Sequence, residues 1–187
     1  DWAMNMHIRG WNEGLIVYVL AASSPTYSIS KEVYDQGWAR NGGMKNGRNF
    51  YDITLPLGSD KGGPLFFAHY SFLGLDPRNL SDAYADYWEQ NVAHSRINHA
   101  YCVANPKKYV GYSDECWGLT ASDIPDSYTA SSPTNDKGTI APTAALSSMP
   151  YTPEESMKAL RYFYYVLGDR LFKEYGFRDA FNLSSRW

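Results

Sequence analysis

An acidic residue in apolar surroundings, Glu13, has the clearest potential for acid–base chemistry in this sequence. It lies between Trp11-Asn12 and Gly14, just before the apolar run Leu15 to Ala22. A helix without a polar face has to be surrounded by protein, so we expect Glu13 to be enclosed as well. Burial disfavours the charged form of a carboxylic acid, and an acid that keeps its proton near neutral pH can act as a general acid. A buried Glu13 bonded to Arg9 or to backbone amides is the structural alternative.

Further carboxylates lie in two segments that lack a helical pattern. They are Asp114, Glu115 and Asp123, which flank Trp117, and Asp179 near the end of the chain. Such loop carboxylates are commonly solvated or cap helices. Two acids that face each other across a sugar would instead perform glycoside hydrolysis, and their separation decides between inversion and retention. The sequence leaves that separation open.

Other kinds of catalysis have little support. The run Gly42 to Gly47 lacks the Gly-Lys-Ser/Thr ending of a phosphate-binding loop, and no serine lies in a nucleophile elbow. The histidines show no paired metal-ligand spacing, which favours structural or substrate hydrogen-bonding roles for them. They are His7, His69, His94 and His99. We therefore expect neither a metal nor a cofactor.

Composition narrows the range of partners. The 187 residues carry 17 basic and 20 acidic side chains, a net charge of -3, which leaves no basic surface for nucleic acid. The longest apolar run, Leu15 to Ala22, is far shorter than the roughly 20 residues that cross a bilayer, so we predict no membrane span. Cys102 and Cys116 could form one disulfide or remain as buried thiols. The aromatic content of 16%, mostly Tyr and Trp, suits amphipathic ligands such as sugars, or a Tyr-rich core.

Helical periodicity and capping residues predict the elements that position these side chains. The expected helices span residues 11–22, 31–40, 64–73, 81–103 and 140–148, and a last one begins at Thr152. Ser30 and Ser81 are the expected N-caps, and Thr152 with Glu155 predicts a capping box. Residues 48–58 suggest an irregular or hairpin excursion, and residues 104–138 suggest a long binding loop. About six helices with little strand predict an all-α architecture of helical hairpins.

Four runs of residues, spread over most of the chain, resemble one family. They are Trp11-Asn12-Glu13, His69 to Pro77, Cys116 to Asp123 and Gly138 to Ala145. The resemblance is to the bacterial glucoamylase-like glycoside hydrolase family. That family includes endo-β-1,2-glucanases and the glucoamylase-like domain of cyclic β-1,2-glucan synthases.

The resemblance implies an (α/α)6 toroid of inner and outer helices with a glycan cleft at its centre. Residues 1–187 resemble the C-terminal part of a single catalytic domain of this kind, about half of the toroid, with three helical hairpins and long loops. The expected partners are therefore a glucan substrate and the missing N-terminal half of the same domain. On this resemblance, we expect the remainder either to have been lost or to be present as a separate piece.

The function implied by the resemblance is hydrolysis of a glucan by carboxylic general acid/base catalysis, with β-1,2-glucan favoured and α-glucan as the alternative substrate. Glu13 would be the acid, and Asp179, Asp123 or an acid of the missing half would be the base. Trp117, Tyr70, His69, Trp11 and Asn12 would bind the substrate. The resemblance also implies a periplasmic or secreted location, with a lipid anchor before processing as an open alternative.

Two other functions remain open at this stage. One is a non-catalytic glycan-binding component, whose cleft persists without a working acid/base pair. The other is a glucan transglycosylase or cyclase that uses the same cleft.

Overall fold

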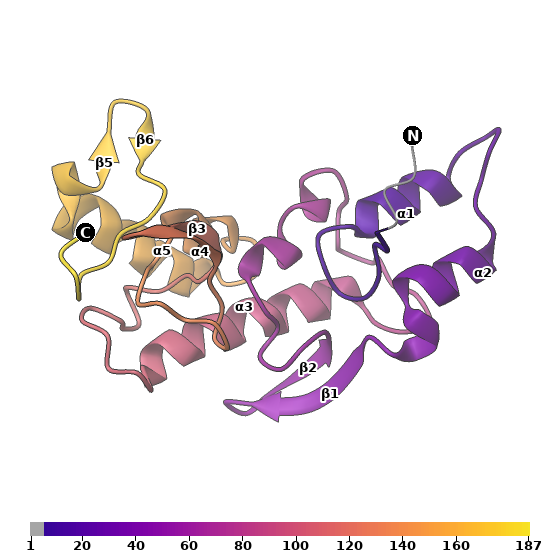
Figure 1. Cartoon of the computed structure of the whole chain (residues 1–187), viewed down its shortest axis with the longest axis horizontal. Helices are drawn as coiled ribbons and strands as arrows, with labels where there is room; N and C mark the ends of the chain where they lie inside the picture. The colour runs from indigo at the N-terminus through magenta and orange to yellow at the C-terminus, as the bar shows by residue number, and fades with distance from the viewer. Residues whose placement is uncertain (1–5) are drawn as a thin grey trace.

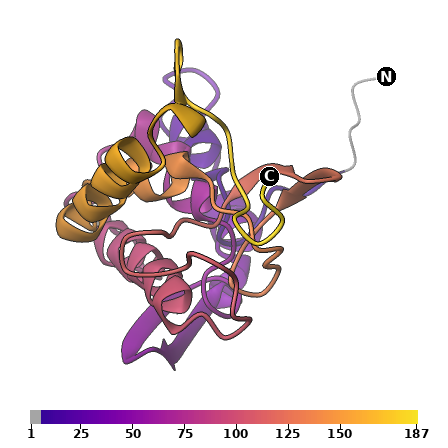
Figure 2. The same cartoon turned by 90° about the vertical axis from the view of Figure 1, so that its left-hand side faces the viewer.

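One long helix, α3 (Tyr87–Ala104), runs along the middle of the molecule and joins two groups of shorter elements (Figure 1). The structure is a computed structural model, and it describes residues 6–187. The first group contains α1 (Leu15–Ala22), α2 (Lys31–Val33), β1 (Lys45–Phe50) and β2 (Ile53–Leu57). The second contains β3 (Ala121–Ile124), β4 (Ser127–Ala130), α4 (Pro142–Ser147), α5 (Pro153–Arg161), β5 (Phe172–Lys173) and β6 (Gly176–Phe177). In the view of Figure 2, α5 and the β3–β4 hairpin lie on opposite sides of the molecule.

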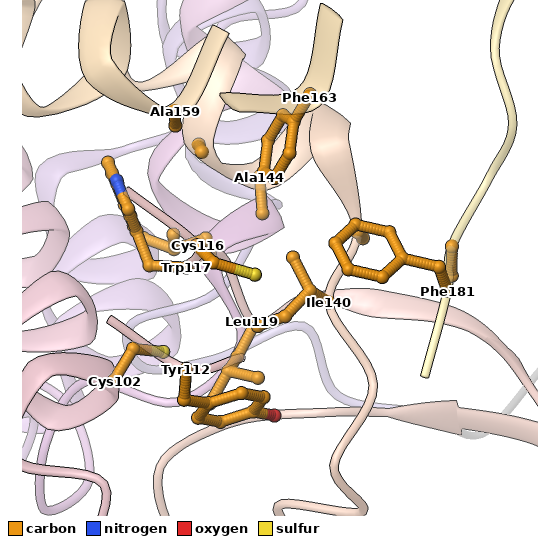
Figure 3. Close-up of a cluster of buried hydrophobic side chains, with 14 of the residues drawn as sticks. Cys102, Tyr112, Cys116, Trp117, Leu119, Ile140, Ala144, Ala159, Phe163 and Phe181 are labelled. Carbon is orange, nitrogen blue, oxygen red and sulfur yellow. The ribbon is translucent and has the colours of Figure 1, made fainter. Parts of the chain in front are cut away.

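Each group has its own hydrophobic core, and α3 contributes to both. Trp11, Trp38 and Tyr87 belong to the first core. The second core contains Cys102 of α3 and, among others, Trp117 (Figure 3). The shared helix therefore fixes how the two groups are placed relative to each other.

Several predicted elements are confirmed. The apolar run forms α1, and Ser30 caps α2, whose turns continue as a π-helical segment over Tyr34–Trp38. The excursion at residues 48–58 belongs to the antiparallel β1–β2 hairpin, and the short helix near residue 142 is α4. Local patterns and caps were sufficient for these elements.

The all-α prediction needs correction. Residues 6–187 contain three two-stranded antiparallel sheets, and the β3–β4 hairpin lies inside the stretch predicted to be a structureless loop. The predicted helix over residues 64–73 is instead two 3₁₀ turns, Leu65–Ala68 and Ser71–Leu73. The N–H of Leu65 donates to the Leu119 carbonyl at 3.1 Å, so a distant segment shapes this region. The toroidal arrangement stays a prediction.

Two capping predictions are wrong. α3 begins at Tyr87 with Asp86 as its N-cap, because the Asp86 carboxylate accepts the Glu89 N–H at 2.9 Å and Ser81 lies upstream in a short bridge. α5 does begin after Thr152, but the Thr152 hydroxyl donates to the Ser148 carbonyl at 3.1 Å instead of capping the helix.

The surroundings of α1 also differ from the prediction. Its sequence is apolar on every side, yet only Leu15 is buried, while Val17 is 51% and Leu20 63% exposed. The described residues cover one side of this helix only. Among residues 6–187, no helix has both the length and the apolar character needed to cross a bilayer.

Candidate active site

An open groove of about 650 Å³ gathers several of the predicted site residues. Its walls come from residues 66–73, from residues 120–121 and Tyr128, and from residues 143–151, with Asp179 at one side. These segments are far apart in the sequence. The groove therefore exists only because the fold of the second group packs against the turns that follow Pro64.

Exposed tyrosines border this groove. Tyr70 is 59% exposed and Tyr128 is 65% exposed. The Tyr70 ring packs against Phe66, with ring centroids 5.4 Å apart, so its orientation is supported from one side. An exposed tyrosine offers a flat apolar face and a hydroxyl, and both are useful for binding a sugar.

Asp179 is the carboxylate of the groove. It is exposed, and its side chain accepts a hydrogen bond from the backbone N–H of Asp123 at 2.8 Å. Two residues further along the chain, Phe181 exchanges two backbone hydrogen bonds of 2.9 Å with Ile140, which ties this segment to the residues before α4. Asp179 also borders an adjoining hollow of about 560 Å³, together with Thr143 and other residues. Asp179 thus borders two hollows that share part of their lining.

His69 lies at the inner wall of the groove. Its Nε2 is 3.1 Å from the Ser148 hydroxyl, which in turn donates to the Ala144 carbonyl at 2.8 Å. The hydroxyl proton is committed to that carbonyl, so His69 donates from Nε2 and its Nδ1 is left as an acceptor. Burial, with a smaller contribution from His94, lowers the pKa of His69 to about 3. His69 is therefore neutral at physiological pH, and its Nδ1 can accept a hydrogen bond from a hydroxyl group of a ligand.

The backbone of Glu13 is hydrogen-bonded to Ser71, which lies between the groove residues Tyr70 and Phe72. The Ser71 hydroxyl donates to the Glu13 carbonyl at 2.5 Å and accepts the Ile16 N–H at 3.1 Å. Ser71 directly follows the groove residue Tyr70. The Glu13 side chain itself is exposed, so the prediction that this chain encloses it is wrong. The reason is that the described residues leave the outer side of α1 uncovered.

Three predicted ligand-binding residues are placed differently from expectation. Trp117 is fully buried in the second core, where its indole N–H donates to the Glu155 carbonyl at 3.2 Å, so no face is open to a sugar (Figure 3). Trp11 is only 6% exposed, inside the first core. Asn12 closes a local turn, because its Oδ1 accepts the Gly14 N–H at 2.7 Å.

The sequence analysis missed Tyr128, Thr143 and Ser71. Ser71 and Thr143 lie inside two of the runs that carry the resemblance, His69 to Pro77 and Gly138 to Ala145, but their residue types did not mark them as site residues. Nothing in the local sequence marks Tyr128. Over the part of the chain that the structure describes, no three His, Cys, Asp or Glu side chains come together in a way that could hold a metal ion.

An open groove with an exposed carboxylate, tyrosine faces and a neutral histidine defines a class of site suited to neutral, hydroxyl-rich ligands. The Glycoamylase family model, described as "Putative glucoamylase", matches residues 5–187, and the chain belongs to this family.

Three relatives show how similar the chain is to proteins with described activities. It is 48% identical over 205 residues to an exo β-1,2-glucooligosaccharide sophorohydrolase (non-reducing end) of Parabacteroides distasonis. Among solved structures, it is 50% identical to an endo-β-1,2-glucanase of Chitinophaga pinensis in a complex with sophorotriose and glucose, with a TM-score of 0.95. It is 47% identical to a β-1,2-glucanase of Parabacteroides distasonis, with a TM-score of 0.94.

All of this chain is matched in each comparison, but only part of each relative. The chain covers 28% of the sophorohydrolase, 46% of the Chitinophaga enzyme and 30% of the Parabacteroides enzyme. It thus spans less than half the length of these relatives.

Proposed function

We propose that the chain forms the C-terminal part of a glucoamylase-like catalytic domain that hydrolyses a glucan, with β-1,2-glucan as the favoured substrate. Relatives at 47–50% identity are named for hydrolysis of β-1,2-linked glucans, and this supports the linkage. The observation that carries the proposal is that one groove holds the Asp179 carboxylate and the Tyr70 ring, and that Ser71 binds the backbone of Glu13 next to it.

We propose that the other half of the domain covers α1. The exposed apolar side chains Val17 and Leu20 support this, because a helix without a polar face is stable only when protein surrounds it. The length of the relatives supports it as well, since this chain covers 46% of the Chitinophaga enzyme. Such a cover would exclude water from Glu13, two residues before the helix, and an (α/α)6 toroid is the arrangement we propose for the whole.

In the proposed mechanism, Glu13 is the general acid and protonates the glycosidic oxygen as the bond to the anomeric carbon breaks. Asp179 is the favoured base and removes a proton from the attacking water, with Asp123 or an acid of the other half as the alternatives. The hydrogen bond from the Asp123 N–H would hold the Asp179 carboxylate in place. Tyr70 and Tyr128 would stack on sugar rings, and His69 Nδ1 would accept a sugar hydroxyl. Neither a metal nor a cofactor takes part in this scheme.

The test is the Glu13→Gln variant in the complete domain, assayed on β-1,2-glucan with α-glucan in parallel. Loss of a general acid lowers kcat by about 10²- to 10⁴-fold. Glu174→Gln is the matched control, because Glu174 is an exposed carboxylate in the β5–β6 turn, and its turnover should equal that of the wild type. Near-normal turnover of the Glu13→Gln variant would remove Glu13 from this role.

Product analysis of the same reactions separates hydrolysis from the two other functions. Short reducing sugars support hydrolysis, whereas cyclic or lengthened glucans would assign glycosyl transfer. Glucan binding without any turnover by the wild type would assign a binding component. A periplasmic or secreted location remains part of the proposal, and cell fractionation tests it.

A further inference from the structure

A buried histidine that the proposed mechanism does not use, His94, has both ring nitrogens engaged. His94 lies in α3 and is fully buried. Its Nε2 is 3.1 Å from the Gly63 carbonyl, and its Nδ1 is 3.4 Å from the indole nitrogen of Trp11. A carbonyl only accepts and an indole N–H only donates. The contacts therefore fix one tautomer, with the proton on Nε2 and an acceptor at Nδ1 that faces Trp11.

Packing holds the Trp11 ring in this position. The ring stacks on Tyr87 with centroids 6.2 Å apart and meets Trp38 edge-on at 6.5 Å. A Cβ atom at Gly58 would lie 2.7 Å from Trp11 Cδ1, so the backbone approaches the ring closely from another side. The indole N–H is the one polar group of this ring, and His94 is its partner.

The position of Trp11 determines the start of the segment that carries Glu13. Asn12 accepts the Gly14 N–H at 2.7 Å and donates to the Arg9 carbonyl at 3.2 Å, which closes a tight turn around Glu13. Ser71 binds the Glu13 carbonyl from the groove side. The Glu13 backbone is thus held between an anchor at Trp11 and a second anchor at Ser71.

We propose that His94 is a positioning residue that sets the place of the Glu13 carboxyl group through the Trp11 indole. The inference rests on the proposed role of Glu13 as the acid. His94 does not border the groove and touches no reacting atom. Its contribution is to orient Trp11, and a small displacement of a catalytic group is costly for the reaction.

Two substitutions separate the two hydrogen bonds of His94. His94→Asn places an amide oxygen near the position of Nδ1, so it keeps an acceptor for Trp11 and loses the donor to Gly63. His94→Gln places its amide nitrogen near Nε2, so it keeps the donor to Gly63 and loses the acceptor for Trp11. In the complete domain we expect His94→Gln to lower kcat by about 10- to 100-fold with KM nearly unchanged, and His94→Asn to retain most of the activity.

A second readout does not depend on turnover. With ¹⁵N-labelled tryptophan in the complete domain, the Trp11 indole N–H resonance should shift upfield in His94→Gln and stay near its wild-type position in His94→Asn. Trp11→Phe keeps an aromatic ring and removes the N–H, so it should lower kcat as His94→Gln does. The double variant Trp11→Phe/His94→Gln should lose much less activity than the product of the two single fold-losses, because both substitutions break the same hydrogen bond.

Different results overturn the two proposals. Equal kcat values for His94→Asn and His94→Gln, or an unmoved indole resonance in His94→Gln, would overturn the positioning role of His94. The proposed function would stand in that case as long as Glu13→Gln is inactive. Near-normal turnover of Glu13→Gln would overturn the proposed function instead.

Discussion

The backbone N–H of Asp123 donates a hydrogen bond to the carboxylate of Asp179, 2.8 Å away. The bond joins β3 to the segment that follows β6, across 56 residues of sequence. It uses the main chain of Asp123 and the side chain of Asp179. The two candidate bases therefore have different roles. Of the two, only Asp179 lines the groove. Asp123 supports the Asp179 carboxylate through its backbone N–H, which a side-chain substitution does not remove.

Asp179→Asn should therefore damage catalysis far more than Asp123→Asn. Loss of a general base lowers kcat by about 10²- to 10⁴-fold, whereas Asp123→Asn keeps the supporting N–H and should stay within about 10-fold of the wild type. The measurement is kcat on β-1,2-glucan for both variants in the complete domain. A greater loss for Asp123→Asn would reverse the assignment.

Ser71→Ala should reduce turnover by removing one anchor of Glu13. The hydroxyl bridges the Glu13 carbonyl and the Ile16 N–H at the start of α1. Ser71 is buried, and loss of its two hydrogen bonds should lower the unfolding free energy by about 1–3 kcal/mol. We expect kcat to fall by about 10-fold, since Glu13 is displaced. Ser28→Ala is the control, because Ser28 is exposed, and both quantities should be unchanged in it.

The elements that the sequence predicted well are those fixed by local interactions. α1, α2 and α4 follow their apolar runs and caps, and the body of α3 follows its long periodic pattern. Residues 64–73 could not be predicted, because the Leu65 N–H pairs with Leu119, more than 50 residues away. The β3–β4 hairpin escaped detection as well, since its short strands carry no clear alternation of apolar and polar residues.

The candidate site was predictable in part. The resemblance pointed to Tyr70, His69 and Asp179, and the fold brings these three together in one groove. Trp117 was misassigned because its neighbours in the sequence do not reveal whether a tryptophan faces solvent or a core. For Glu13, the prediction of burial assumed that this chain surrounds the apolar helix on every side, whereas Val17 and Leu20 are exposed.

Gly62→Ala should destabilise the protein strongly, because the backbone at Gly62 packs directly against the His94 ring. A Cβ at Gly62 would lie 2.2 Å from His94 Cδ2, and the residue has a φ of +92°. We expect a loss of about 2–4 kcal/mol in unfolding free energy. Gly47→Ala is the matched control, because Gly47 also has a positive φ, of +69°, but has no atom within 4 Å of its added Cβ. Its cost should be only about 1 kcal/mol, and equal losses in urea denaturation would contradict the steric argument.

Cys102 and Cys116 should resist thiol reagents in the native protein. Both are free and buried, and burial raises the pKa of the Cys116 thiol to about 12 and that of Cys102 further. A thiol reacts as its thiolate, which is scarce at neutral pH in both cases. A colourimetric thiol assay should therefore count neither cysteine before unfolding and both in denaturant. Rapid labelling of either one in the native state would contradict this.

The stability of the protein should decrease as the pH falls from about 6.5 towards 4, with His94 as one cause. Burial lowers the pKa of His94 to about 4, against an ordinary value of 6.5, so between these pH values the unfolded chain binds a proton that the folded chain does not. The contribution of His94 to the unfolding free energy is therefore constant above pH 6.5 and declines between pH 6.5 and about 4, which corresponds to a drop in Tm of about 5–10 °C. Because carboxylates and His69 also titrate at low pH, the check is the difference between wild type and His94→Gln measured at each pH. The variant has no imidazole at this position to protonate, so its stability deficit should shrink as the pH is lowered. A deficit that stays constant from pH 7.5 to pH 4.5 would mean that His94 is not held neutral in the folded protein.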